Sequence, residues 1–146
     1  MAILVYGRDA EVAEWVAAHW TAPIAFNGCR AIGVAEPDGP ESARLIAGIV
    51  YTDHSHDGAN LDMSIASISP RWCTRPVLGA LFAYPFELLH VRRVTAITGR
   101  KNRVARDFLK RLGFREEGIA RHGFARDDAV IHGMLKSECR WTGGRR

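Results

Sequence analysis

The pattern that most restricts the fold lies mid-chain, where a strand-like run is followed by a helical run and a second strand-like run. Residues 59–68 alternate between apolar and polar side chains, which is typical of a half-buried strand. Residues 76–89 form an apolar run with helical spacing, and residues 92–98 again resemble a strand. A helix between two neighbouring strands allows them to lie parallel, so the sequence predicts one β-α-β crossover.

The remaining segments add strands and helices on both sides of this crossover. Before it we expect strands at 2–6, 29–35 and 43–52, a helix at 9–20 capped by Asp9, a loop at 21–27 and a turn at 37–40. After it we expect a helix at 102–112, strands at 116–124 and 129–139, and a turn at Asp127-Asp128. The predicted order is β-α-β-β-β-α-β-α-β-β, which is a mixed α/β (α+β) sheet with an antiparallel front half.

Length and composition set further limits. The 146 residues suit one domain, and no linker divides them, so we expect a single domain over 1–146. A hydrophobic content of 47% with 25% charged residues excludes a disordered or low-complexity chain. No apolar run reaches the roughly 20 residues of a membrane span, and no signal peptide is recognisable. The three widely spaced cysteines predict free thiols in a reducing cytoplasm, with no disulfide framework.

Two helix residues carry specific structural predictions. Pro85 lacks the N–H that would bond the Leu81 carbonyl, so the helix at 76–89 should kink or end near Tyr84. Gly113 stands where a left-handed helix C-cap belongs, with Phe114 as its hydrophobic contact. Helical spacing gives the core candidates Val77, Leu78, Leu81, Phe82, Leu88, Val104, Phe108 and Leu112.

Charge is distributed unevenly along the chain. Residues 1–70 contain three basic and nine acidic side chains, whereas residues 71–146 contain 17 basic and seven acidic ones. A basic half indicates an anionic partner, either a phosphate-bearing cofactor or a nucleic acid. Arg71 and Arg75 lie before a helix N-terminus that Thr74 can cap. This arrangement is either a phosphate site or a solvated basic loop.

Other chemical signatures are incomplete. The chain has no Gly-rich dinucleotide motif, no P-loop and no GxSxG elbow. His54 and His56 could share one face of a strand, but no third ligand accompanies them and we expect no metal. Cys73 lies between two arginines that should lower the pKa of its thiol, yet no histidine partner is placed. Asn102 either caps the following helix or directs its amide to a ligand.

The second half of the chain carries a family motif. Its residues are Asn102, Ala105, Phe108, Gly113 and Phe114, followed by Glu117-Gly118. They match the Asn-x-x-Ala/Ser-x-x-aromatic/Leu-x-x-x-x-Gly-Phe pattern, and the chain resembles the GNAT N-acetyltransferase superfamily in its RimJ/RimL-like branch. The segments 70–72, 82–86, 92–96 and 138–141 resemble small GNAT proteins of phages and prophages.

The resemblance implies a fold in which the fourth and fifth strands splay apart around acetyl-CoA. The pantetheine amides would pair with the strand residues Ile65, Ala66, Ser67 and Ile68. The pyrophosphate would rest on the loop residues Arg71, Thr74 and Arg75. The loop glycines of the family have no counterparts in register here, and Arg71 and Arg75 would compensate with charge-assisted hydrogen bonds. Asn102 would contact the pantetheine arm, and Arg106 would reach the adenosine end.

The implied reaction is direct attack of a neutral primary amine on the thioester in a ternary complex. Asp62, Ser64 and Glu117 are the candidate bases for the amine proton. Leu109 occupies the position of the tyrosine that many family members use as the acid. Tyr84 or Ser67 would then protonate the leaving thiolate.

A second hypothesis remains open beside the enzyme. The chain could be a catalytically inactive GNAT-like module that binds nucleic acid or a protein partner through its basic C-terminal half. Nucleic acid is the less expected partner, because no recognition signature accompanies the basic residues. We expect no membrane partner, and a homodimer is an open alternative.

Overall fold

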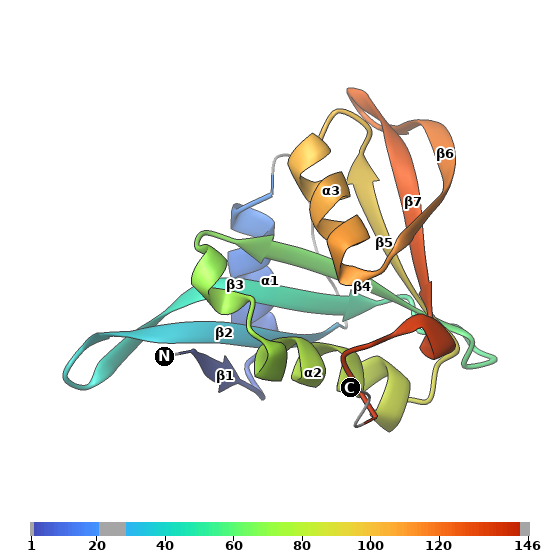
Figure 1. The fold of residues 1–146 in the computed structure, drawn as a ribbon. Helices are drawn as coiled ribbons and strands as arrows, with labels where there is room; N and C mark the ends of the chain where they lie inside the picture. Colours follow the sequence, from blue (N-terminus) through green and yellow to red (C-terminus); the bar gives the residue numbers. More distant parts are fainter. Residues whose placement is uncertain (1, 21–28, 144–146) are drawn as a thin grey trace.

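The computed structural model describes residues 2–20 and 29–143 and places seven strands in one sheet (Figure 1). The loop expected at 21–27 lies outside the described residues. The sheet order is β1-β2-β3-β4-β5-β7-β6. The strands are β1 (Ile3–Val5), β2 (Arg30–Gly39), β3 (Ser42–Thr52), β4 (Asn60–Ser67), β5 (Arg93–Gly99), β6 (Arg115–Phe124) and β7 (Asp127–Leu135).

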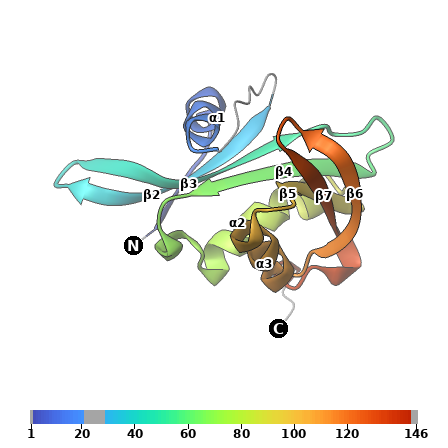
Figure 2. The same ribbon diagram turned by 90° about the horizontal axis from the view of Figure 1, so that it is seen from above.

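The described residues form three α-helices. They cover the two faces of this sheet (Figure 2). They are α1 (Asp9–Ala18) on one face and α2 (Arg75–Ala83) and α3 (Arg103–Leu112) on the other. Together with the strands they give the predicted order of elements, so the mixed α/β fold is confirmed. None of the helices in the described part of the chain is long and apolar enough to cross a membrane.

Helix α1 packs closely on the sheet because glycine faces it. A Cβ added to Gly48 on β3 would lie 2.6 Å from Val16 of α1, so a side chain there would displace the helix. Val12 and Val16 fill this contact and are fully buried. Asp9 is the first residue of α1, and Arg8 holds the cap position that we expected for Asp9. The Asp9 carboxylate instead accepts the Ala31 N–H of β2 at 2.9 Å.

The sheet is forked at its centre. Strands β4 and β5 are its one parallel pair, and their register spans three residue pairs, from Asn60↔Arg93 to Asp62↔Thr95. Beyond these pairs β4 continues beside β3, and β5 continues beside β7. The splayed central strand pair is therefore confirmed. After Asp62 and Thr95, the facing edges of β4 and β5 have no strand partner among residues 2–20 and 29–143.

Helix α2 ends where Pro85 predicts. The α-helical turns stop at Ala83, and residues Tyr84–Leu88 form a π-helical turn, η2, in which the Leu89 N–H donates to the Tyr84 carbonyl at 3.0 Å. The Leu81 carbonyl, which Pro85 cannot satisfy, accepts a 2.6 Å hydrogen bond from the buried Tyr51 hydroxyl of β3. A residue 30 positions away thus completes the helix end.

The predicted caps of α2 and α3 are confirmed. The Thr74 hydroxyl accepts the Val77 N–H, and Asn102 Oδ1 accepts the Ala105 N–H at 3.1 Å. Gly113 has φ 114°, the left-handed value for which glycine is favoured at a C-cap. Phe114 is buried behind it.

Several expected boundaries are wrong. The first hairpin turns at 40–41 rather than 37–40, so Pro37 lies within β2 and opposite Ala43 of β3. Strand β2 extends past β1 here and is an edge strand of the described sheet, which is where a strand accommodates proline. The last hairpin turns at 125–126, so Asp127 and Asp128 begin β7. Strand β7 ends at Leu135, before the 3-10 turn η3 (Lys136–Glu138).

Two expected core residues are also exposed. Leu88 lies in the π-helical turn and is 68% exposed, while Val104 at the start of α3 is 81% exposed. The π turn shifts Leu88 off the apolar face of α2. In α3 the buried residues are Leu109 and Leu112, with Phe108 packed against the core.

Candidate functional site

The fork between β4 and β5 is the feature on which the candidate site is built. Ile65, Ala66 and Ser67 lie on the β4 arm, beyond the last pair with β5. Backbone N–H and C=O groups on such an edge require partners other than a neighbouring strand. Ile68 is directed toward β3, because its N–H donates to the Ile46 carbonyl at 2.9 Å. Hydrogen-bonded pairs alternate along an antiparallel ladder, so Ala66, opposite Gly48, is also directed toward β3, and Ile65 and Ser67 direct their backbone groups to the fork.

The loop after β4 leads directly into the N-terminus of α2. It begins with the 3-10 turn η1 (Pro70–Trp72), in which the Ser69 hydroxyl accepts the Arg71 N–H. Trp72 is buried and its ring lies 5.8 Å from the Phe108 ring of α3. This packing fixes the loop against the core and places the α2 N-terminus, with its free N–H groups and positive dipole end, beside the fork.

Two arginines expected at the cofactor are held by carboxylates. Arg71 donates two hydrogen bonds to Glu36, at 3.0 and 2.7 Å, from the loop to the β2–β3 hairpin. Arg106 donates two to Glu116, at 2.8 and 3.0 Å. Hydrogen bonds from Arg71 and Arg44 lower the pKa of Glu36 to about 2, and the bond from Arg106 lowers the pKa of Glu116 to about 2.

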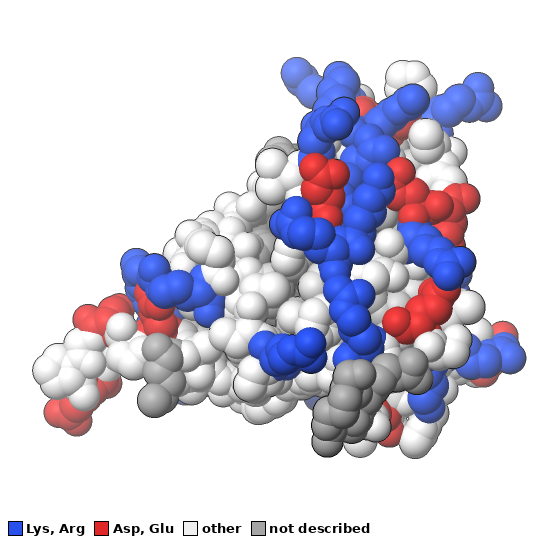
Figure 3. All heavy atoms as spheres, viewed as in Figure 1, with Lys and Arg blue, Asp and Glu red and all other residues white. Residues whose placement is uncertain are grey.

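Arg75 has a different environment. Its guanidinium lies 5.5 Å from the Trp141 ring, which Arg140 covers at 4.6 Å, and the Trp141 indole donates to the Leu112 carbonyl. Figure 3 shows basic side chains in a stripe over α3 and down toward the C-terminal segment. Exposed basic residues of these elements are Arg103, Lys110, Arg111 and Arg140. An anion at the α2 N-terminus would therefore meet a basic surface.

A cavity of about 600 Å³ lies on the α1 face of the fork. Asp62 and Ser64 of β4, two of the candidate bases, line it. Asp53, which the sequence analysis did not single out, also lines it. Its other walls include Trp20, Thr95, Ile97, Phe124 and Ile131. The cavity thus combines aromatic and aliphatic walls with two carboxylates.

The environment of Asp62 raises the pKa of its carboxyl above the usual value. Burial is the main cause, and the neighbouring Asp53 carboxyl adds to it. A hydrogen bond from Asn60 Nδ2 to Asp62 Oδ1, at 2.9 Å, acts in the opposite direction, as does the charge of Arg93. Asp62 is therefore easier to protonate than an ordinary aspartate.

The remaining catalytic candidates lie elsewhere. Glu117 lines neither described cavity and pairs with Arg93 at 2.7 Å. The Tyr84 ring packs on Tyr51 with centroids 4.8 Å apart, and burial raises the pKa of Tyr84. The expected lowering of the Cys73 pKa is wrong, because burial raises it. The described residues contain no cluster of three or more His, Cys, Asp or Glu side chains that could hold a metal ion.

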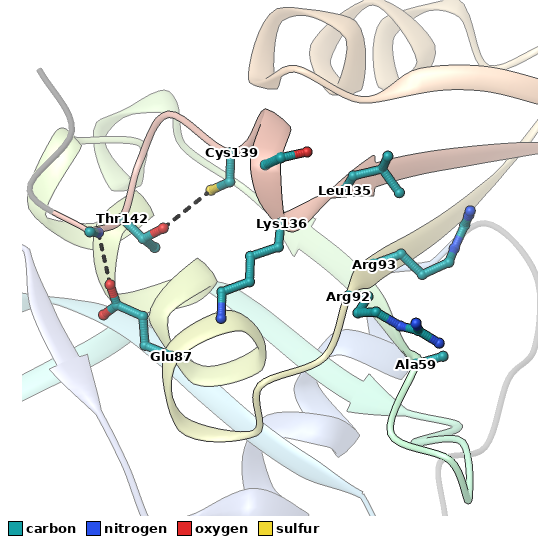
Figure 4. A pocket seen from close by; sticks show the side chains of 10 residues that line it. Ala59, Glu87, Arg92, Arg93, Leu135, Lys136, Cys139 and Thr142 are labelled. Atoms are coloured by element: carbon teal, nitrogen blue, oxygen red, sulfur yellow. Dashed lines mark hydrogen bonds between the residues drawn. The ribbon is translucent and has the colours of Figure 1, made fainter.

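A second cavity, of about 770 Å³, lies at the opposite ends of β4 and β5 from the fork (Figure 4). Arg92, Arg93, Lys136 and Glu87 contribute its charged groups. Figure 4 shows the Glu87 carboxylate accepting the Gly143 N–H, at 2.8 Å, which fastens the C-terminal segment to η2. None of the residues expected to bind the cofactor lines this cavity.

A forked mixed sheet of this order, with α2 and α3 on one face, defines a GNAT-like fold. No family model and no curated protein matches the sequence. Among solved structures, mutant forms of the spermidine/spermine N-acetyltransferase SpeG from Vibrio cholerae are 15% identical over 94% of this chain and 96% of that one, with a TM-score of 0.71. A further SpeG point mutant is 14% identical, with coverages of 93% and 94% and a TM-score of 0.72.

A structure from T. thermophilus that is described as an acetyltransferase extends the comparison. It is 20% identical over 94% of this chain and 87% of that one, with a TM-score of 0.67. The chain therefore shares its fold with GNAT acetyltransferases that differ from it widely in sequence.

Proposed function

We propose that this protein is an N-acetyltransferase that moves an acetyl group from acetyl-CoA to a primary amine by direct attack in a ternary complex. The fork between β4 and β5 is the observation that carries the proposal. It lies between a basic surface on one face of the sheet and an acidic cavity on the other. This arrangement suits an anionic donor and a cationic acceptor whose reacting groups meet at the fork.

The donor side follows from the residues around the fork. The pantetheine amides would pair with the backbone of Ile65 and Ser67, since Ala66 and Ile68 are directed toward β3. The pyrophosphate would bind the α2 N-terminus at Thr74 and Arg75. Asn102 Oδ1 is used by the helix cap, so its Nδ2 would face the pantetheine arm.

Two other donor-side candidates require rearrangement. Arg71 and Arg106 would reach the phosphates of acetyl-CoA only by exchanging the carboxylates of Glu36 and Glu116 for phosphate oxygens. We therefore assign the phosphates first to the helix N-terminus and Arg75.

The acceptor side supplies the proton chemistry. Asp62 would take a proton from the ammonium form of the acceptor, because it lines the cavity and its raised pKa suits a base. Ser64, on the same wall, would orient the amine. A backbone N–H near Ala66 would stabilise the developing oxyanion. As the acid that protonates the leaving thiolate, we propose Ser67 on the β4 arm of the fork. Ser67 is preferred to Tyr84, because the Tyr84 ring packs on Tyr51.

Calorimetry with acetyl-CoA, followed by transfer assays with a panel of amines, tests the proposal. We expect saturable micromolar binding and transfer to a polyamine such as spermidine, the substrate named for the SpeG neighbours. Asp62→Asn should lower transfer about 100-fold or more and leave acetyl-CoA binding unchanged. Absence of binding at millimolar acetyl-CoA would contradict the proposal.

The inactive-module hypothesis has one observation in its favour, the basic stripe over α3. Loss of acetyl-CoA binding together with salt-sensitive binding of an oligonucleotide would support it. We further propose placement in the RimJ/RimL-like branch and a relationship to the small GNAT proteins of phages, both of which rest on the sequence motifs. A cytoplasmic location is proposed from the three free cysteines.

A further inference from the structure

A continuous line of hydrogen bonds crosses the sheet beside Asp62. Asn60 Nδ2 donates to Asp62 Oδ1 at 2.9 Å, and Thr95 Oγ1 bonds to Asn60 Oδ1 at 2.6 Å. Arg93 Nε donates to Thr95 Oγ1 at 3.1 Å, and Arg93 Nη2 donates to Glu117 Oε1 at 2.7 Å. We call these five residues the orienting chain.

The orienting chain has one direction because arginine can only donate. The Thr95 hydroxyl accepts from Arg93, so its own hydrogen is free to point at Asn60 Oδ1. That bond fixes the Asn60 amide with its oxygen toward Thr95 and its nitrogen toward Asp62. Arg93 therefore determines, through two neutral side chains, that the Asp62 carboxylate receives a donor.

The orienting chain also lies at the point where β4 and β5 diverge. Asn60 is in register with Arg93, and Asp62 with Thr95, so all four side chains lie on one face of the three-pair junction. Gly133 of β7 leaves space for the distal ion pair. A Cβ at that position would collide with Glu117 and Arg93.

We propose that Asn60, Thr95, Arg93 and Glu117 are positioning residues that hold the Asp62 carboxylate toward the acceptor cavity. The catalytic part of this inference rests on the proposed N-acetyltransferase function. One ammonium proton of the acceptor passes to Asp62, and the lone pair of the neutral amine then attacks the thioester carbon. The C–S bond breaks, and the second proton of the nitrogen passes through Ser67 to the leaving thiolate, which gives the amide and free CoA. Glu117, a candidate base in the sequence, instead anchors the far end of the chain.

The charged groups around Asp62 act on its protonation in opposite directions, and the orienting chain contributes to this balance. Among the described residues, Asp53 after β3 disfavours the Asp62 carboxylate and Arg93 on β5 favours it. Glu117 on β6 acts through Arg93. The side-chain N–H of Asn60 favours the charged form, so loss of this donor should raise the pKa of Asp62.

Thr95→Val tests the chain, because it removes a hydroxyl that forms no hydrogen bond to Asp62 itself. We expect the Asp62 titration midpoint, followed by NMR of 13C-labelled aspartate carboxyls, to move up by about half a pH unit or more. Asn60→Ala should move it at least as far, and Thr95→Ser should restore it. Thr98→Val is the matched control, since Thr98 lies on the other face of β5 and its hydroxyl has no hydrogen-bond partner among the described residues.

The outcomes separate positioning from catalysis. A midpoint that moves in Asn60→Ala but not in folded Thr95→Val overturns the orienting chain. Glu117→Gln provides a second route if Thr95→Val does not fold, with a smaller upward movement expected. In an active enzyme, the acid limb of kcat/KM should move with the NMR midpoint, and a fixed acid limb overturns the role of Asp62 as base. If no amine is acetylated, the proposed function is wrong. The NMR titration of Asp62 still tests whether the orienting chain acts on its carboxyl group.

Discussion

An arginine that the sequence places at the cofactor can instead be occupied by an ion pair with a glutamate of the same protein. Arg106 lies in the expected cofactor region, yet its guanidinium is bound by Glu116 of β6. Glu116 also lies near Lys110 at 3.8 Å and His132 Nε2 at 3.6 Å. These basic groups make the charged form of Glu116 part of the folded structure, which gives stability a pH dependence.

We expect Glu116→Gln to flatten the acid side of the stability profile. The pKa of Glu116 is about 2 in the folded protein and near 4.5 in an unfolded chain, so its stabilisation is present above the higher value and lost as pH falls toward the lower one. The wild-type melting temperature should therefore fall more steeply between about pH 5 and about pH 2 than that of the variant. Thermal melts across this range measure the difference.

Glu14→Gln on α1 serves as the control, because Glu14 has no ion pair among the described residues. Its profile should parallel that of the wild type. Parallel profiles for the wild type and Glu116→Gln would show that the pKa of Glu116 does not differ between the folded and unfolded states, and would contradict the prediction.

The residues that sequence reasoning placed well are those whose partner is near in the chain. The caps at Thr74 and Asn102 bond backbone groups three residues ahead, and their geometry follows from the helix itself. Arg71 and Glu36 are 35 residues apart, and Thr95 and Asn60 are also 35 apart. Such pairs depend on strand register and turn position, which a single sequence does not specify.

At the scale of elements, the junction between α2 and η2 lacks one backbone hydrogen-bond donor, and a side chain from a strand distant in sequence replaces it. Pro85 was correctly predicted to end the α-helix, since its missing N–H is a property of one residue. The donor that replaces it, Tyr51, comes from β3 and could not be predicted from helix periodicity. The expected core position of Leu88 was wrong for the same reason, because the spacing assumed a regular α-helix.

Tyr51→Phe should destabilise the protein by about 1–3 kcal/mol, because it leaves the buried Leu81 carbonyl without a donor. The cost should be about 1 kcal/mol smaller in a Pro85→Ala background, where residue 85 regains an N–H for that carbonyl. Urea unfolding of the wild type, both single variants and the double variant measures this coupling.

Tyr6→Phe is the matched control for loss of a tyrosine hydroxyl, since Tyr6 is 60% exposed. It should change the free energy of unfolding little. Strict additivity of Tyr51→Phe and Pro85→Ala would mean that the hydroxyl and the proline act independently.

Across the whole molecule, the first half of the sequence is acidic and the second half is basic, and the sheet places the two halves next to each other. The acidic Asp53 and Asp62 come from the first half, and the basic residues of α3 and the C-terminal segment come from the second. The fork lies between the two surfaces. Long-range attraction of a polyanionic ligand to the basic face is then a property of the assembled fold rather than of any one contact.

We expect acetyl-CoA binding to weaken about 3- to 10-fold when NaCl is raised from about 50 to about 500 mM, because salt screens the basic face. The affinity for pantetheine, which lacks the nucleotide phosphates, should change little over the same range of salt. Calorimetric titrations at several salt concentrations test this. A single-stranded oligonucleotide that binds more tightly than acetyl-CoA, with a steeper salt slope, would favour the binding-module hypothesis.

The three-pair junction between β4 and β5 also bears on how freely this sequence can vary. Asn60, Asp62 and Thr95 are among the few residues that join the two halves of the described sheet. The same side chains orient the carboxylate in the orienting chain. A substitution there acts on sheet integrity and on proton transfer at once, so a saturation mutagenesis survey should find this junction among the least tolerant surface-accessible parts of the chain.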